Sequence, residues 1–288
     1  IIMSSDNNNL IKSNLLINQN YYFLFESLIP LNRCHISSEM DKAYDLLIGH
    51  YEGARILKYD SGKDIYKWKK PPGWECYSAE LRDQDGNIII SKDKHILAVF
   101  TYSPSVDKIV SFEELETHLF SDPNRPKSIC FHFRNQYRHW EPDWGFSIPH
   151  EERLNLSYSK NYNVQINSEF KKNKDLIQSD YHHQGELDDT FLFIGHFDHP
   201  GQANDGLAGC IAAYELINRL KNRSTRYSYR AFASVEIVGS VFYLDGLGKE
   251  VNNFKEGLFL GFSAIDSPFV YQTSFHGQSL FDRIIRFL

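Results

Sequence analysis

The stretch FIGHFDHPGQANDGLAG (193–209) gathers imidazole and carboxyl side chains directly after a run of apolar residues. Carboxylates crowded at one point repel one another unless a cation compensates their charge. Imidazole and carboxylate together form a ligand set that suits zinc better than calcium. The stretch therefore predicts a divalent metal site, in which Asp198 could hold the ring of His196 in one tautomer and Asp205 could bridge two ions about 3.5–4 Å apart.

The segments around this stretch predict a strand, a helix and a second strand. Residues 190–197 form a short continuous apolar run, residues 207–221 have helical periodicity, and residues 227–235 again resemble a strand. A crossover helix requires two parallel strands, so their carboxyl ends lie at one edge of the sheet, where ligands of open α/β folds bind. The acidic and imidazole residues leave the first strand at that edge, and Glu236 leaves the second.

Glu236 has the chemistry of a proton acceptor at this edge. A zinc ion lowers the pKa of the water that it binds to about 7, so a nearby carboxylate can take the proton as the water attacks a carbonyl group. The chemistry that these residues predict is metal-assisted hydrolysis of an amide. The structural alternative is that the Asp and Asn side chains only cap the helix and form turns.

Two longer stretches resemble a known family. GHFDHPGQANDGLAGCIAAYELINRL (195–220) and YRAFASVEIVGSVFYL (229–244) are similar to the zinc-dependent aminopeptidases of metallopeptidase clan MH. They resemble more closely the bacterial aminopeptidase-like domain proteins associated with polysaccharide biosynthesis, and this resemblance covers roughly residues 20–288. The residues that match the pattern of that group are His196, His199, Pro200, Ala203, Asn204 and Asp205.

The resemblance implies one or two Zn2+ ions and assigns roles to individual side chains. The implied metal ligands are His196, Asp205, His199 and, after the strand-like GLFLGFSAI, Asp266. The implied catalytic residues are Asp198, as the orienting acid, and Glu236, as the base or a ligand.

The sequence departs from the family pattern at two points. The broader aminopeptidases carry two adjacent glutamates, one as base and one as ligand, whereas Val235 precedes Glu236 here. The family also places a ligating histidine in a C-terminal segment beyond Leu288, where this sequence stops. We therefore expect a chain truncated at its C-terminus, for which the second metal ion and the activity stay open.

The predicted fold class is α/β, with a three-layer αβα mixed sheet like that of zinc exopeptidases and a small inserted β-rich domain. Within that domain, Asp85-Gly86 between alternating runs indicates a hairpin. The predicted boundaries are 1–18 for a flexible leader, 19–55 and 150–288 for the aminopeptidase-like domain, and 56–149 for the insertion.

Composition narrows the choice of partners and compartment. The net charge of −6 and the pI of about 6.1 provide no basic field for nucleic acid. No stretch approaches the roughly twenty apolar residues of a membrane span, and no export signal is visible. The four cysteines are scattered without a C-x-x-C pair, which favours free thiols and a cytoplasmic location. We expect a small peptide-like or amide substrate, no nucleic acid and no membrane, and leave a homo-oligomer open.

The function predicted from these observations is zinc-dependent hydrolysis of peptide-like amide bonds by an aminopeptidase-like enzyme. One alternative is a non-catalytic scaffold or binding protein in polysaccharide biosynthesis. Another is a metal-dependent deacylase of modified sugars. The tryptophans and tyrosines of residues 137–146 are expected to pack between the two domains rather than to line a substrate groove.

Overall fold

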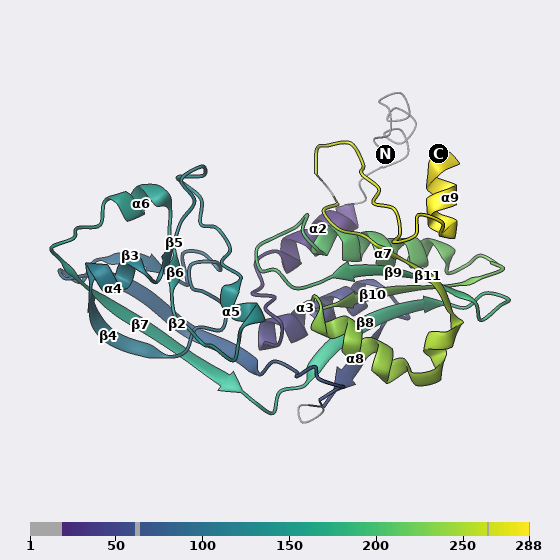
Figure 1. Ribbon diagram of the computed structural model, residues 1–288, viewed down its shortest axis with the longest axis horizontal. Helices are drawn as coiled ribbons and strands as arrows, with labels where there is room; N and C mark the ends of the chain where they lie inside the picture. Colours follow the sequence, from purple (N-terminus) through teal and green to yellow (C-terminus); the bar gives the residue numbers. More distant parts are fainter. Residues whose placement is uncertain (1–18, 61–63, 264, 288) are drawn as a thin grey trace.

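The computed structural model describes residues 19–60, 64–263 and 265–287, so the predicted leader at 1–18 lies outside the described residues. A mixed five-stranded sheet forms the part of the molecule on the right of Figure 1. Strands β9, β10 and β11 run parallel, and β8 runs antiparallel to both of its neighbours. In spatial order the strands are β1 (Arg55–Tyr59), β8 (Leu176–His183), β10 (Ser228–Ser234), β9 (Thr190–His196) and β11 (Phe254–Phe259).

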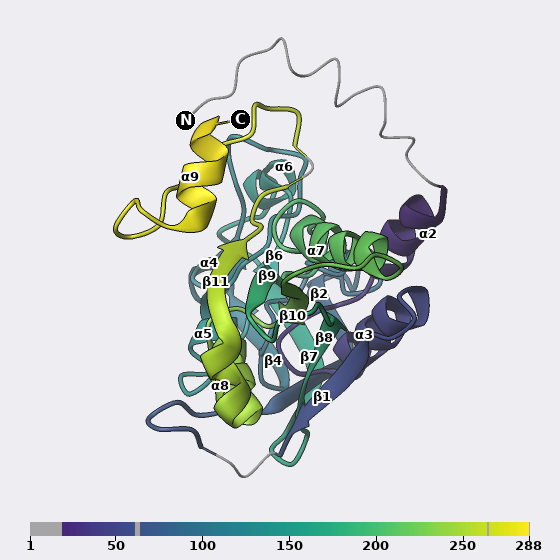
Figure 2. The same cartoon turned by 90° about the vertical axis from the view of Figure 1, so that its right-hand side faces the viewer.

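Helices cover both faces of this sheet, as Figures 1 and 2 show, so the predicted three-layer αβα mixed sheet is confirmed. One face carries α2 (Gln19–Leu28), α3 (Ser38–His50) and α7 (Leu207–Leu220), and the other carries α8 (Val238–Leu247). The 3-10 helix η2 (Gly248–Asn253) follows α8, and α9 (Leu280–Phe287) comes last. None of the helices within the described ranges is long and apolar enough to span a membrane.

Strand β10 shows how the sequence produces these layers. Its side chains alternate between the two faces of the sheet, because successive Cβ atoms of a strand point in opposite directions. Ala231 and Ala233 lie in the core that also holds α2, α3 and α7, where small side chains let the helices approach. Phe232 faces the other way and stacks on Tyr243 of α8, with 3.8 Å between the ring centroids. Both faces of the sheet are therefore buried at β10. The continuous apolar run of β9 is typical of a strand buried on both faces.

A second, antiparallel sheet forms the part of the molecule on the left of Figure 1. Asp85-Gly86 joins β2 to β3, so the predicted hairpin is confirmed, and Gly86 has a φ of +87° that favours glycine. In spatial order the strands are β3 (Ile88–Ser91), β2 (Gly73–Asp83), β7 (Asn161–Lys171) and β4 (Val106–Ser111). The small elements beside it are α4 (Phe112–Glu116), β5 (Leu119–Phe120), α5 (Arg134–Tyr137), β6 (Phe146–Ser147) and α6 (His150–Leu154).

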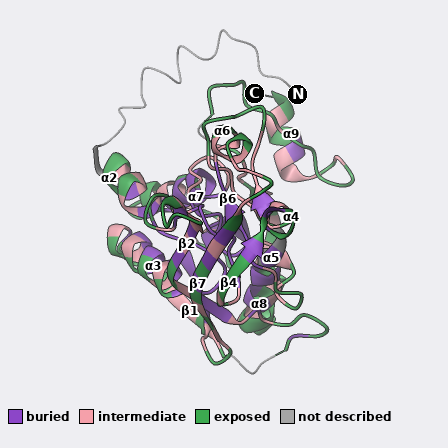
Figure 3. Cartoon of the chain, turned by 90° about the vertical axis from the view of Figure 1, so that its left-hand side faces the viewer, coloured by how far each residue is buried: buried purple, intermediate pink, exposed green. Residues whose placement is uncertain are grey.

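Sheet membership differs from the predicted domain boundaries at both ends of the insertion. Strand β1, predicted to begin the insertion, pairs with β8 of the first sheet. Strand β7, predicted to belong to the aminopeptidase-like domain, pairs with β2 and β4. Its alternate residues Tyr162, Val164 and Ile166 are buried in the core of the second sheet, and Figure 3 shows the mixture of buried, intermediate and exposed positions along β7. Alternation in the sequence reveals a buried face but not the sheet that it faces.

Candidate metal centre

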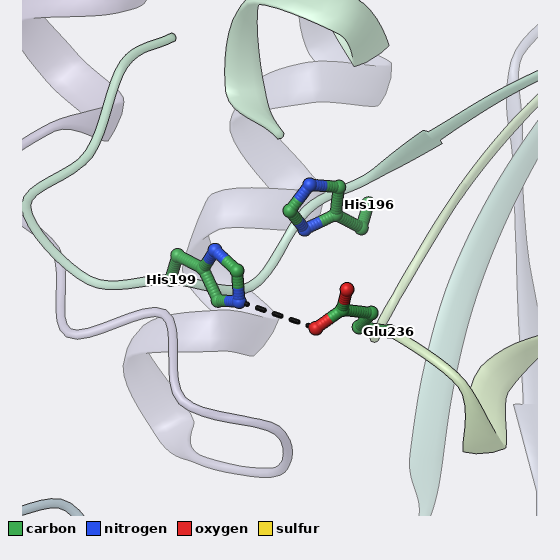
Figure 4. A group of neighbouring side chains, drawn as sticks. All are labelled: His196, His199 and Glu236. Atoms are coloured by element: carbon green, nitrogen blue, oxygen red, sulfur yellow. Dashed lines mark ion pairs between the residues drawn. The ribbon is translucent and has the colours of Figure 1, made fainter. Parts of the chain in front are cut away.

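The predicted strand–helix–strand unit brings the acidic and imidazole residues to one sheet edge. Strands β9 and β10 pair in parallel, with His196 opposite Ser234 at their carboxyl ends. Glu236 follows β10 by two residues and therefore emerges beside the chain that leaves β9. Side chains that are far apart in the sequence meet here, as Figure 4 shows for His196, His199 and Glu236.

These three side chains form a group of candidate metal donors. One ligand atom from each of His196, His199 and Glu236 lies within 4.8 Å of the other two. Nε2 of His199 is 3.4 Å from a carboxylate oxygen of Glu236, the contact dashed in Figure 4. Two imidazole nitrogens and a carboxylate oxygen are a ligand set that zinc commonly takes in proteins.

Asp205 joins the two histidines from the other side. Its Oδ1 is 3.1 Å from Nε2 of His196, and its Oδ2 is 3.1 Å from Nδ1 of His199. The turn that presents Asp205 continues through Gly206, whose φ is +103°. A Cβ atom at Gly206 would lie 2.4 Å from the carbonyl oxygen of His196, so glycine lets the turn lie against the end of β9.

Asp198 lies beneath the cluster with its side chain fully buried. It accepts a hydrogen bond of 3.0 Å from the backbone N–H of Glu236, and its carboxylate is 3.6 Å from Nδ1 of His196. Burial on its own would raise the pKa of Asp198, but the imidazoles of His196 and His35 hold this pKa well below its usual range. The carboxylate is therefore ionised and in place to orient His196 and the backbone of Glu236.

Three residues of the site were missed by the sequence analysis, and two of them precede α3. His35 places Nε2 at 3.0 Å from Asp198. The fully buried Arg33 donates hydrogen bonds to the carbonyl oxygens of Phe197 (2.7 Å), His199 (3.1 Å) and Gln202 (2.7 Å). Arg33 thereby fixes the chain that carries the histidine, but a single buried arginine leaves no periodic signal in a sequence.

Tyr137 of α5 is the third missed residue, and it comes from the insertion. Its hydroxyl donates a hydrogen bond to the carboxylate of Glu236 and lies 3.1 Å from Nε2 of His199. The prediction that the tryptophans and tyrosines of 137–146 pack between the domains is wrong for Trp144, which lies in the core of the second sheet. It also missed the polar contacts of Tyr137.

Asp266 is the one predicted site residue that the structure does not bring to the cluster. Asp266 lies beyond β11, outside any helix or strand, and is exposed. Within the described part of the chain, no hydrogen bond or ion pair of the cluster involves Asp266.

A cavity of about 610 Å3 opens beside the cluster. One wall carries polar groups of the site, and the other is largely aromatic and comes from the insertion. Two of the lining residues that are not glycine have positive φ values, His199 at +81° and Ile237 at +61°. Such backbone conformations are strained for residues with a side chain, and they cluster at functional sites. The lining residues are Phe131, Phe133, Tyr137, Arg138, His199, Gln202, Asp205, Glu236 and Ile237.

Comparison with known proteins agrees with this architecture. A family model described as "Domain of unknown function (DUF4910)" matches residues 22–288. A protein of Clostridium acetobutylicum, whose name proposes polysaccharide biosynthesis and an aminopeptidase-like domain, is 27% identical over 237 residues. These residues cover 82% of this chain and 53% of that protein, so the chain spans about half the length of its curated relative.

Solved structures show the same fold. A crystal structure from Clostridium acetobutylicum, named as a proposed peptidase, has a TM-score of 0.85 and 25% identity, covering 98% of this chain and 65% of that one. A zinc aminopeptidase from Bacillus subtilis has a TM-score of 0.57 and 14% identity, covering 91% of this chain and 73% of that one. The fold of this chain is therefore aminopeptidase-like.

Proposed function

This chain belongs to the family described as a domain of unknown function (DUF4910), and from that premise we propose that it is a zinc-dependent hydrolase of peptide-like amide bonds. The observation that carries the proposal is the convergence of His196, His199 and Glu236 within 4.8 Å, beside a cavity at the carboxyl edge of parallel strands. Ligands of open α/β folds bind at that edge.

The donor set fits zinc in both number and chemistry. Two imidazoles and one carboxylate leave a fourth position open, as catalytic zinc sites do. Asp198 lies against Nδ1 of His196 and Asp205 against Nδ1 of His199, so each ring is oriented by a carboxylate and keeps Nε2 for the metal. When bound at these side chains, zinc would polarise a substrate carbonyl group and make water a better nucleophile.

Glu236 would bind the metal ion as an anion. The hydrogen bond with His199 lowers the pKa of Glu236, partial burial opposes this, and the hydroxyl of Tyr137 lowers it further. The carboxylate is therefore ionised at neutral pH, which is the form that binds a metal ion. The backbone N–H of Glu236 donates a hydrogen bond to Asp198, which fixes the position of the backbone that carries the side chain.

Metal content and hydrolysis test the proposal together. We expect the purified chain to bind zinc in stoichiometric amount and His196→Ala to lose it, as measured by mass spectrometry of the dialysed protein. The exposed His276 provides a matched control, because His276→Ala removes an imidazole outside the site. With zinc bound, the chain should release aniline from aminoacyl anilides. A folded chain that binds no zinc, or that holds zinc and cleaves no amide, would contradict the proposal.

The name of the relative favours a second candidate, a metal-dependent deacylase of modified sugars, since it links that protein to polysaccharide biosynthesis. The same site chemistry would serve both reactions. N-acetylated sugars distinguish the two, because an aminopeptidase needs a free α-amine and a deacylase does not. A zinc-free chain that binds polysaccharide precursors without cleaving them would instead indicate the non-catalytic scaffold.

A further inference from the structure

The cavity beside the cluster is lined by groups of opposite charge. Asp205 and Glu236 line it from the edge of the first sheet, and Arg138 lines it from the insertion. Among the lining residues that the structure describes, Arg138 is the one with a permanent positive charge. A divalent cation at the cluster would offset the two carboxylates. The guanidinium group of Arg138 would then be the charge that remains for a substrate.

The backbone of Arg138 is held next to the cluster, although its side chain is exposed. Its N–H donates a hydrogen bond of 3.2 Å to the carbonyl oxygen of Asn135, which is buried. The residue before it, Tyr137, donates a hydrogen bond to Glu236 and packs on the ring of His35, with 5.3 Å between the ring centroids. The insertion therefore presents Arg138 to the cavity from an anchored segment.

The guanidinium group of Arg138 has a weak partner, the carboxylate of Glu141. Nη1 of Arg138 lies 3.8 Å from that carboxylate, and the two side chains are 61% and 57% exposed. Exposed ion pairs of this kind contribute little to stability, so an anionic ligand can replace Glu141 at little cost. Guanidinium forms two parallel hydrogen bonds with carboxylate or phosphate, which makes arginine the side chain best suited to these groups.

The rest of this wall is aromatic. Phe131, Phe133 and Tyr137 line it, and the ring of Phe133 is 63% exposed. Binding sites for small molecules combine such apolar surfaces with a few polar groups that fix the orientation of the ligand, and a volume of about 610 Å3 is within their range. The wall therefore suits a molecule that has an apolar part and an anionic group.

We propose that Arg138 selects substrates that carry a carboxylate or phosphate group in addition to the amide that is cleaved. This inference rests on the proposed function and names the substrate class of the same site. The insertion thereby determines specificity, whereas the candidate metal ligands come from the edge of the first sheet.

Matched pairs of substrates test this role. Leucyl-phenylalanine and its C-terminal amide differ in the carboxylate, and N-acetylglucosamine 1-phosphate and N-acetylglucosamine differ in the phosphate. We expect the zinc-loaded chain to prefer the anionic member of one pair by about tenfold or more in kcat/KM, because a hydrogen bond to a charged group is worth that much. The pair that shows the preference identifies the anionic group.

The preference should disappear in Arg138→Gln, which removes the charge from an exposed position and should leave the fold intact. Arg125→Gln is the matched control, because Arg125 is an exposed arginine of the insertion that pairs with Asp122 and lies outside the lining of the cavity. This control should keep the wild-type preference. Equal kcat/KM values within both pairs for the wild-type chain, or a preference that persists in Arg138→Gln, overturns the inference and leaves the proposed function standing.

Binding measurements separate this inference from the proposed function. A leucyl-phenylalanine analogue with CH2 in place of the amide C=O cannot be hydrolysed, and calorimetry measures the affinity of its acid and amide forms. Calorimetry with the two sugars gives the same comparison where they are not cleaved. Tighter binding of an anionic form that is lost in Arg138→Gln, without cleavage of any substrate, supports the inference and contradicts the proposed function. A zinc-loaded chain that neither binds nor cleaves any of these compounds overturns both.

Discussion

Two fully buried carboxylates of the first sheet, Asp180 and Asp198, have different partners. Asp180, in the middle of β8, is bound by Arg55 at 2.7 Å and lies 3.5 Å from Arg230, with the hydroxyl of Tyr243 at 3.3 Å. Asp198, at the strand edge, lies against imidazoles and a backbone N–H instead. One carboxylate is compensated by guanidinium groups that stay charged, and the other lies against imidazoles, the side chains that most often bind metals in proteins.

The difference separates a structural ion pair from a candidate site. Around Asp180 the charges of the arginines and acids balance, because Arg230 also binds Glu250 at 3.0 Å. At the strand edge, three carboxylates are grouped with histidines, and Arg33 is the buried guanidinium next to them. A cation would complete the compensation there. Substitutions of the two aspartates should therefore act on different properties of the protein.

The largest effect is expected for Asp180→Ala. Removal of this carboxylate leaves the side chain of Arg230, only 7% exposed, without one of its partners. Breaking a buried pair in this way costs about 3–5 kcal/mol in the free energy of unfolding, which urea denaturation would measure. Zinc content per folded chain should not change. A loss below about 1 kcal/mol, or a loss of zinc from the folded protein, would show that the two aspartates do not differ as described.

For Asp198→Asn we expect a smaller change in free energy, and we expect it in metal binding rather than in unfolding. The amide keeps the shape of the side chain and loses the charge that orients His196, so zinc affinity should fall about 10–100-fold. Chelator competition measures this affinity, with Asp180→Asn as the matched control. Equal zinc affinities for both variants would remove the distinction between the two carboxylates.

The smallest effect is a pH dependence of the free energy of unfolding, which arises because the pKa of Asp198 differs between the folded and the unfolded chain. Its pKa is lowered in the fold, whereas an aspartate of the unfolded chain has a pKa of about 3.9. As the pH falls through about 4, the unfolded chain takes up a proton that folded Asp198 does not, so this contribution to stability is lost by up to about 1.4 kcal/mol per pH unit. In urea unfolding of the zinc-free protein, the free energy of unfolding should decrease less steeply with falling pH for Asp198→Asn than for the wild-type chain. Identical slopes would speak against a lowered pKa.

Local patterns in the sequence were sufficient to predict the strand, helix and strand that carry the candidate site. A buried strand, a crossover helix and a second strand place Glu236 beside His196 by geometry alone, and the register of β9 and β10 agrees. Arg33 and Tyr137 could not be found in this way. Arg33 lies 164 residues from Phe197, which it contacts, and Tyr137 lies 99 residues from Glu236. Such contacts depend on tertiary packing, which leaves no period in the chain.

The boundary of the insertion was less predictable than the sheet itself. Strands β1 and β7 each have sequences that suit a strand, yet each pairs with the sheet opposite to the one predicted. Strand alternation records burial of one face, whereas the choice of sheet depends on long-range pairing. Asp180 is a comparable case, because an aspartate within the strand segment LIQSDYHH reveals neither arginine that binds it.

Anomalous diffraction at the zinc absorption edge, from crystals of this chain grown with zinc, tests the central claim most directly. The account predicts a peak at bonding distance from the imidazoles of His196 and His199 and from the carboxylate of Glu236. A peak elsewhere, or no peak while these three side chains are well ordered, would contradict it.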